Sequence, residues 1–153
     1  MSHAATTPGF SPSARYVNES AQRGLRSLQE SNVFGLESLL REELATVWEQ
    51  CRVENWDGHA AVAVSRDALR NAYSFLESLP IGFPAPSIGA EPDGHLTLEW
   101  HRSPRRTLSV SVSPDDELHY AGLFGPSRVC GTEACFGEVP KSVLHLIRRV
   151  YSA

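Results

Sequence analysis

The chain has 153 residues, of which 41% are hydrophobic and 21% charged, and its formal net charge is −4. This length favours one domain, and this composition is typical of a soluble globular protein. The acidic balance argues against nucleic acid as a partner, because nucleic-acid-binding domains carry a clear excess of Lys and Arg. No apolar run approaches the ~20 residues that span a bilayer, so no membrane association is expected. With only three cysteines and no secretory signal pattern, we expect a cytoplasmic protein.

The chain divides into two parts by composition. Residues 1–30 are rich in Ala, Ser, Thr, Pro and Gly, and their apolar residues follow no sustained period. Such a segment buries too little surface to offset the entropy lost on ordering, which predicts a flexible N-terminal tail. Residues 31–153 carry the periodic patterns of regular structure and are predicted to form a single α+β domain.

Two helices are predicted first. Apolar residues recur with the spacing of one helical face over residues 36–51. Ser65 is a suitable N-cap for a second helix, with Asp67 in its first turn, and Pro80 ends it. The buried face of this second helix is predicted from the apolar spacing to be Ala68, Leu69, Ala72, Tyr73, Leu76 and Leu79.

The period then changes to two. Strands are predicted over residues 95–101, 107–113 and 118–124, with further short strands near 86–91 and 128–135. A last helix begins with Pro140 at its first position, with an apolar stripe of Val143, Leu144, Ile147 and Val150. The expected fold is an α+β two-layer domain, in which an antiparallel four- to five-stranded meander carries three helices packed mainly on one face.

The stretch "ENWDGHAA" (54–61) joins the two predicted helices and permits two interpretations. As a structural turn, Asn55 and Asp57 are turn formers, Gly58 supplies a positive φ, and Trp56 anchors the turn in the core. This interpretation is favoured, because turn formation explains nearly every residue.

The alternative interpretation is catalytic. Glu54, Asp57 and His59 offer the groups for general acid–base chemistry in a small hydrolase or nuclease. No recognisable nucleophile motif accompanies them.

No set of residues predicts a metal or cofactor site. His95 and His101 lie about 20 Å apart along one strand, and His95 and His119 would lie two strand spacings apart, about 9.5 Å. Cys130 and Cys135 form an isolated pair, whereas structural zinc takes four ligands. No dinucleotide-binding or P-loop glycine pattern is present.

Three arginines cluster at one predicted hairpin turn. Arg102, Arg105 and Arg106 could grip a phosphate or carboxylate with bidentate hydrogen bonds. The alternative is an ordinary solvated turn.

A row of small hydroxyls marks the middle predicted strand. Thr107, Ser109, Ser111 and Ser113 point away from the expected helices. This face is predicted to be solvated, as is common in antiparallel sheets, or to be covered by a partner's strand, a helix or the N-terminal tail.

The segments "NWDGHAAVAVSRDAL", "LTLEW", "LSVSV", "LHYAGLFG" and "GTEACF" together resemble a family of small uncharacterised bacterial proteins. Members carry an Asn-Trp-Asp-Gly turn before a Ser-capped helix, a strand ending in Glu-Trp and a Tyr-x-Gly strand. The resemblance covers about residues 54–150 and implies a bacterial, cytoplasmic setting and one compact domain. The family has no established activity, so it implies no catalytic residues. Members favour an aromatic residue after Asp-Gly, where this chain has His59.

Two functions from different classes follow. The first is a non-catalytic domain that binds another bacterial protein, in the manner of antitoxins, immunity proteins or defence accessories. The second is the small hydrolase or nuclease that uses Glu54, Asp57 and His59. The absence of catalytic motifs and the acidic charge favour the first.

Overall fold

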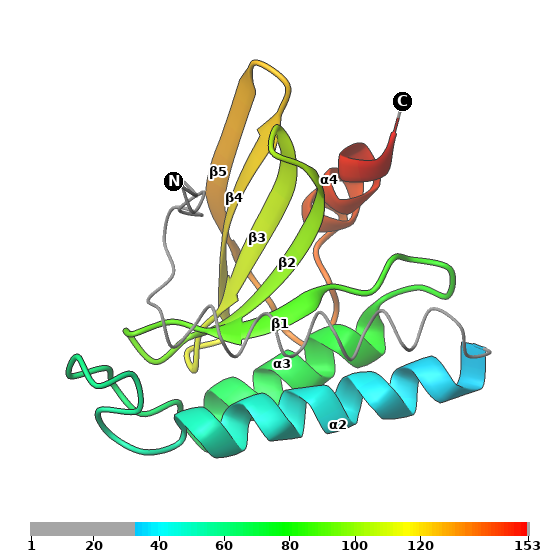
Figure 1. Ribbon diagram of the computed structural model, residues 1–153. Helices are drawn as coiled ribbons and strands as arrows, with labels where there is room; N and C mark the ends of the chain where they lie inside the picture. The colour runs from blue at the N-terminus through cyan, green and yellow to red at the C-terminus, as the bar shows by residue number, and fades with distance from the viewer. Residues whose placement is uncertain (1–32, 153) are drawn as a thin grey trace, which may run out of the picture.

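The computed structural model describes residues 33–152, which form three helices and five strands (Figure 1). The predicted α+β fold is confirmed, and the predicted flexible tail, residues 1–30, lies outside the described residues. The strands form one open antiparallel sheet in the order β1-β2-β3-β4-β5, so every strand pairs with its neighbour in the chain. The elements are α2 (Val33–Cys51), α3 (Arg66–Ser78), β1 (Ser87–Ala90), β2 (Leu96–Ser103), β3 (Arg106–Val112), β4 (Glu117–Phe124), β5 (Ser127–Ala134) and α4 (Lys141–Tyr151).

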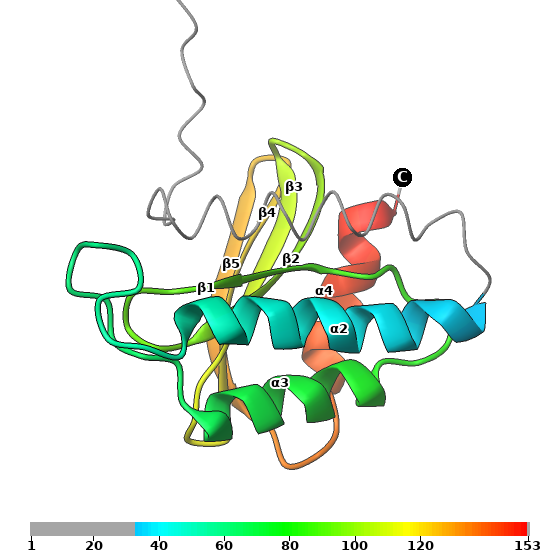
Figure 2. The ribbon, with the colours of Figure 1, turned by 60° about the horizontal axis from the view of Figure 1, so that its bottom comes forward.

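The core lies between one face of the sheet and the helices. Figure 2 shows α2 and α3 side by side, with α4 standing against the strands behind them. The ring of Trp100 on β2 packs against Phe75 of α3 with centroids 6.2 Å apart, and its Nε1 donates to the carbonyl of Pro84 at 2.8 Å. The fully buried side chains of the sheet include Ile88, Leu96, Leu98, Trp100, Leu108, Val110, Val112 and Leu118. Their alternation along the strands is what the period of two predicts.

Helix α3 begins where the sequence predicts, and its predicted apolar face packs against the core, but the most deeply buried positions differ in part. The Ser65 side chain accepts a hydrogen bond from the N–H of Ala68 at 3.2 Å, as an N-cap does. Phe75, which the predicted face omits, is fully buried, whereas Leu69 and Tyr73 are only half-buried. The small side chains of Ala68 and Ala72 bring the helix close to the sheet, and Phe75 one turn further on fills the remaining space.

Helix α4 differs from its prediction at two positions. Pro140 is the N-cap rather than the first helical residue, a shift of one position. Leu146 is buried and Leu144 is half-buried, so the apolar stripe is rotated toward Leu146. Within residues 33–152, none of the helices combines the length and the apolar character that crossing a membrane requires.

Candidate functional site

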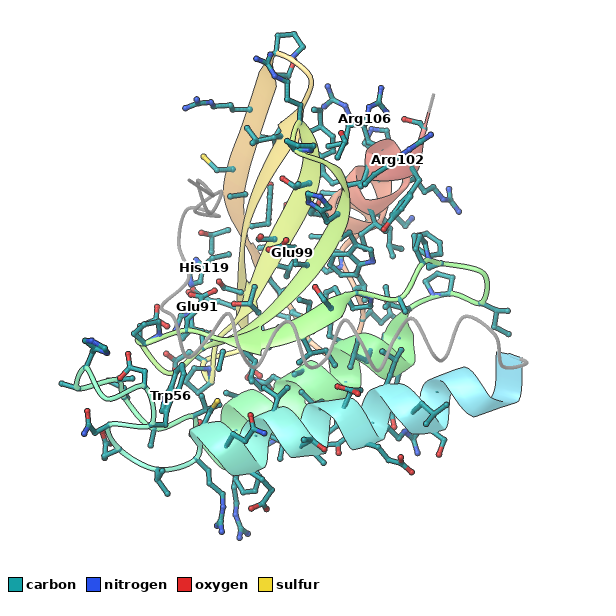
Figure 3. The ribbon with its side chains drawn as sticks, in the orientation of Figure 1. Trp56, Glu91, Glu99, Arg102, Arg106 and His119 are labelled. Atoms are coloured by element: carbon teal, nitrogen blue, oxygen red, sulfur yellow. The ribbon has the colours of Figure 1, made fainter. Side chains whose placement is uncertain are left out.

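The face of the sheet turned away from the helices, here called the outward face, carries the polar side chains. Because side chains alternate along a strand, residues between the core positions point to this side. The cross-strand register sets them in two lines across the sheet, Thr97–Ser111–His119–Thr132 and Glu99–Ser109–Ala121–Cys130. Figure 3 shows Glu91, Glu99 and His119 together on this part of the molecule. The predicted hydroxyl row is therefore flanked by carboxylates and imidazoles.

Glu99 lies near the middle of the outward face, yet its side chain is only 8% exposed. Its Oε2 accepts a hydrogen bond from the hydroxyl of Ser109 at 3.2 Å. Burial raises the pKa of Glu99 above its usual value, and the Ser109 hydrogen bond and the nearby His101 oppose this only in part. Glu99 is thus a carboxyl group that is shielded from solvent and loses its proton at a higher pH than an exposed glutamate does.

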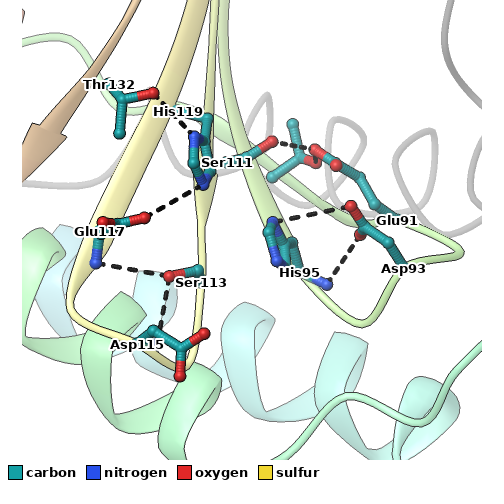
Figure 4. A network of polar contacts seen from close by, with 10 residues as sticks. Glu91, Asp93, His95, Ser111, Ser113, Asp115, Glu117, His119 and Thr132 are labelled. Atoms are coloured by element: carbon teal, nitrogen blue, oxygen red, sulfur yellow. Dashed lines mark hydrogen bonds and ion pairs between the residues drawn. The ribbon is translucent and has the colours of Figure 1, made fainter.

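Glu91 follows β1 and is held by two hydroxyls from different strands. Its Oε1 accepts from the Thr97 hydroxyl at 2.5 Å and also from the hydroxyl of Ser111 (Figure 4). Thr97 is only 2% exposed, so this contact is shielded from solvent. These bonds fix the position of the Glu91 carboxylate beside β2 and β3.

Two histidines meet on the outward face. His95 precedes β2 and His119 lies on β4, and their rings are nearly parallel, with centroids 5.7 Å apart and an interplanar angle of 9°. The predicted separation of about 9.5 Å refers to the strand axes; the side chains close the rest of the distance. The Nδ1 of His119 lies 3.0 Å from the Thr132 hydroxyl on β5.

The two ends of the predicted hydroxyl row have different surroundings. Ser113 is buried, and its Oγ accepts from the N–H groups of Asp115 and Glu117 at 3.1 and 3.4 Å. It therefore closes the turn between β3 and β4. Thr107 at the other end is half-buried and lies opposite His101.

Two of the three clustered arginines contact the end of α4. Arg102 Nη1 donates to the carbonyl of Tyr151 at 2.5 Å, and Arg106 Nη1 donates to that of Ser152. Figure 3 shows both arginines near this helix end. Carbonyls at a helix C-terminus lack intrahelical partners and carry partial negative charge, so cations are favoured there. Arg102 and Arg106 therefore bind backbone carbonyls of the protein itself, and Arg105 is exposed on the turn.

The stretch 54–61 forms a closed loop. The Asp57 side chain, 6% exposed, accepts at Oδ1 from the N–H of His59 at 2.8 Å and of Ala61 at 3.0 Å. Partial burial raises the pKa of Asp57, but these backbone hydrogen bonds and the His59 charge outweigh it, so that the pKa lies below its usual value. Trp56 packs against the core and donates from Nε1 to the carbonyl of Val62 at 3.0 Å.

Other residues of this loop also fit a turn. Asn55 and Gly58 have φ values of 60° and 74°, the left-handed region that their residue types tolerate. The His59 ring contacts the carbonyl of Asp57 at 2.9 Å, and Glu54 is exposed. The catalytic interpretation requires an accessible Asp57 carboxylate and a His59 ring directed at a substrate, whereas both groups here contact the loop itself.

The sheet has an open edge at β5. Within the described chain, β5 pairs only with β4, and exposed and half-buried residues alternate from Arg128 to Ala134. Phe136, two residues beyond its end, is 82% exposed. A groove beside Phe136 is lined by Asn71 and Ser74 of α3 and by Glu117 of β4. Sequence reasoning identified the strand but not that it forms an edge.

No protein-family model matches the chain, and no curated protein or solved structure is significantly similar to it. Its function is therefore argued from the geometry of the described residues.

Proposed function

We propose that this protein is a non-catalytic interaction domain and that its protein partner adds a strand to β5. The observation that carries the proposal is the open edge of β5, eight residues long, beside an exposed aromatic side chain. An unpaired strand edge is a template for an extended segment of another chain, and such strand addition is a recurring mode of protein recognition.

The backbone of β5 offers a defined set of hydrogen-bonding groups. The N–H of Cys135, just after β5, donates to the carbonyl of Asp116, just before β4, at 2.8 Å. The N–H of Cys135 therefore points to the β4 side. Backbone groups of antiparallel strands alternate in direction, so the N–H groups of Gly131 and Glu133 point toward β4. Those of Arg128, Cys130 and Thr132 point to the open edge. A partner strand would pair with these three residues.

Phe136 supplies a side-chain anchor for the same partner. Aromatic residues, Phe among them, are enriched at protein–protein interfaces relative to the rest of the surface. The groove between Phe136, Asn71 and Glu117 lies at the end of β5 and offers polar groups around an apolar ring. An extended segment that pairs with β5 would continue directly toward it.

The class of partner follows from the acidic charge and from the bacterial resemblance of the sequence. We propose a bacterial cytoplasmic partner, as in antitoxin, immunity or defence-accessory pairs. The contacts that Asp57 and His59 make within their own loop support this function over the hydrolase or nuclease alternative.

The test is affinity purification from the source organism with three versions of the full chain: wild type, Cys130→Pro and Cys130→Ser. Proline removes an N–H from the open edge and leaves the bonds to β4 in place, whereas serine keeps the N–H. We expect a stoichiometric partner that Cys130→Ser retains and that Cys130→Pro binds at least ten-fold more weakly, about 1.4 kcal/mol.

Hydrogen exchange of the purified complex gives the second measurement. Protection is expected at the amides of Arg128, Cys130 and Thr132. A partner that binds Cys130→Pro as tightly as wild type, with no protection in β5, would overturn strand addition. Chain dimers that dissociate in Cys130→Pro would identify the partner as a second copy of this protein.

A further inference from the structure

The hairpin between β1 and β2 brings three metal-binding side chains together. Glu91, Asp93 and His95 each place one potential ligand atom within 4.8 Å of the other two. The N–H of Gly94 donates to the carbonyl of Glu91 at 3.0 Å, and Gly94 has a φ of +93°, a value that glycine adopts without strain. This tight turn directs the Asp93 carboxylate back toward His95, with Oδ2 3.7 Å from Nδ1.

A fourth candidate ligand comes from a distant part of the chain. The His119 ring on β4 lies 5.7 Å from that of His95, centroid to centroid. With metal–nitrogen bonds of about 2.0–2.1 Å, two imidazoles on one tetrahedral ion have centroids roughly 5 Å apart. The centroid distance is compatible with shared coordination, but the two rings are stacked. His119 would therefore have to turn its Nε2 from Glu117, 3.9 Å away, toward the hairpin to join the ligand set.

Hydrogen bonds outside this set hold two of its members in place. The Glu91 carboxylate accepts from the hydroxyls of Thr97 and Ser111, which come from two different strands (Figure 4). The Thr132 hydroxyl lies 3.0 Å from Nδ1 of His119, while Nε2 faces the Glu117 carboxylate at 3.9 Å. Partners that orient ligating groups in this way are characteristic of metal sites and strongly affect affinity.

The charges of the cluster are not balanced by cationic side chains. Among the described residues, neither Glu91 nor Asp93 forms an ion pair with a lysine or an arginine. The two carboxylates therefore concentrate negative charge on this hairpin. A divalent cation would neutralise it.

We propose that Glu91, Asp93, His95 and His119 bind one divalent transition-metal ion, with Zn²⁺ as the best chemical match. Two imidazoles and two carboxylates form a four-ligand nitrogen and oxygen set that suits Zn²⁺, Ni²⁺ or Cu²⁺. Ca²⁺ and Mg²⁺ take six or more oxygen ligands, which this hairpin does not supply. Asp93 is exposed, so an ion has a path from solvent into the site.

The test uses the full chain without an affinity tag. Calorimetric titration with ZnCl₂, and visible absorption after titration with CoCl₂, should show one ion per chain in tetrahedral coordination. His95→Ala and His119→Ala should each weaken Zn²⁺ binding at least ten-fold. His145→Ala, on the exposed surface of α4, and His3→Ala, in the N-terminal segment, are the matched controls and should bind as wild type does.

A further variant, Thr97→Val, keeps all four proposed metal ligands. Thr97→Val removes one of the two hydroxyls that hold Glu91, and the expected loss of Zn²⁺ affinity is 10- to 100-fold. Apo-protein melting curves establish that each variant is folded before titration. Binding that survives both His95→Ala and His119→Ala, or that is lost in His3→Ala, would overturn the site. So would the absence of stoichiometric binding at millimolar Zn²⁺.

The metal site and the strand-addition function fail separately. Cys130→Pro changes the open edge of β5 and none of the proposed ligands, so it should bind Zn²⁺ as wild type does. Thr97→Val changes the metal site and leaves the edge of β5 intact. If Cys130→Pro weakens only partner binding and Thr97→Val weakens only Zn²⁺ binding, the two proposals are independent of each other.

Discussion

The two edges of the sheet are built differently. Strand β1 has four residues, all of them buried, and Ile88 and Ala90 belong to the core beneath α2. Strand β5 has eight residues, and none of them is fully buried. Solvent exposure on the outward face increases in the same direction. Near β1, Ser87, Thr97 and Glu99 are buried, whereas near β5 Ala121 and Cys130 are exposed.

This difference separates two roles within one sheet. Proteins protect sheet edges by shortening them or covering them, because open edges pair with other chains. β1 shows both devices, and burial of its side chains contributes to folding. Among the described residues, β5 shows neither device, which is why strand addition is proposed at this edge. The comparison predicts that substitutions near β1 change stability and that substitutions in β5 change binding.

The largest expected effect tests this comparison directly. Ile88→Ala removes a fully buried side chain from β1 and should lower the free energy of unfolding by about 2–5 kcal/mol. Val129→Ala on β5 removes a half-buried side chain and should cost less than about 1 kcal/mol. Urea denaturation of both variants measures the difference. Equal losses would show that β5 contributes to the core as β1 does.

The next effect concerns the shielded carboxyl of Glu99. Burial raises its pKa, with the Ser109 hydrogen bond and His101 opposing, so the folded state holds the proton more tightly than the unfolded chain does. The resulting stabilisation is fully present below the unfolded pKa, about 4.3, and is lost as pH rises through the folded pKa. Glu99→Gln removes this titration and should therefore gain stability relative to wild type as pH increases from about 4 to about 7.

Denaturation midpoints measured across this pH range test the prediction. Glu138→Gln removes one exposed carboxylate and controls for the change in net charge. A constant difference between Glu99→Gln and wild type at every pH would mean that Glu99 is not shielded in solution. The β1 side of the outward face would then be as open as the β5 side.

The fold was predictable because its signals are local. The alternation in "HLTLEWH" shows which residues of β2 face the core, and Ser65 caps α3 where the sequence indicates. The burial of Phe75 was not predictable in the same way, since it depends on the space that Trp100 and two alanines leave. Helical spacing shows that a face is apolar but does not show how closely it approaches the sheet.

The candidate sites depended more on distant contacts. The hydroxyl row of β3 was visible in the sequence, but the bond from Ser111 to Glu91 spans 20 residues. The bonds from Arg102 and Arg106 to the end of α4 span still more, so these arginines resembled an anion site. The spacing of Glu91, Asp93 and His95 in "EPDGH" was the one local signal for a shared cluster.

The smallest expected effect is on the stability of the isolated protein. Cys130→Pro should lower the free energy of unfolding by less than about 1 kcal/mol relative to Cys130→Ser, because no bond to β4 is lost. Denaturation of the two variants without partner measures this difference. A loss of about 3 kcal/mol, the cost of proline where its N–H was bonded, would place the Cys130 N–H inside the sheet. A small loss, combined with a large loss of partner binding, would separate the role of β5 in recognition from the role of β1 in folding.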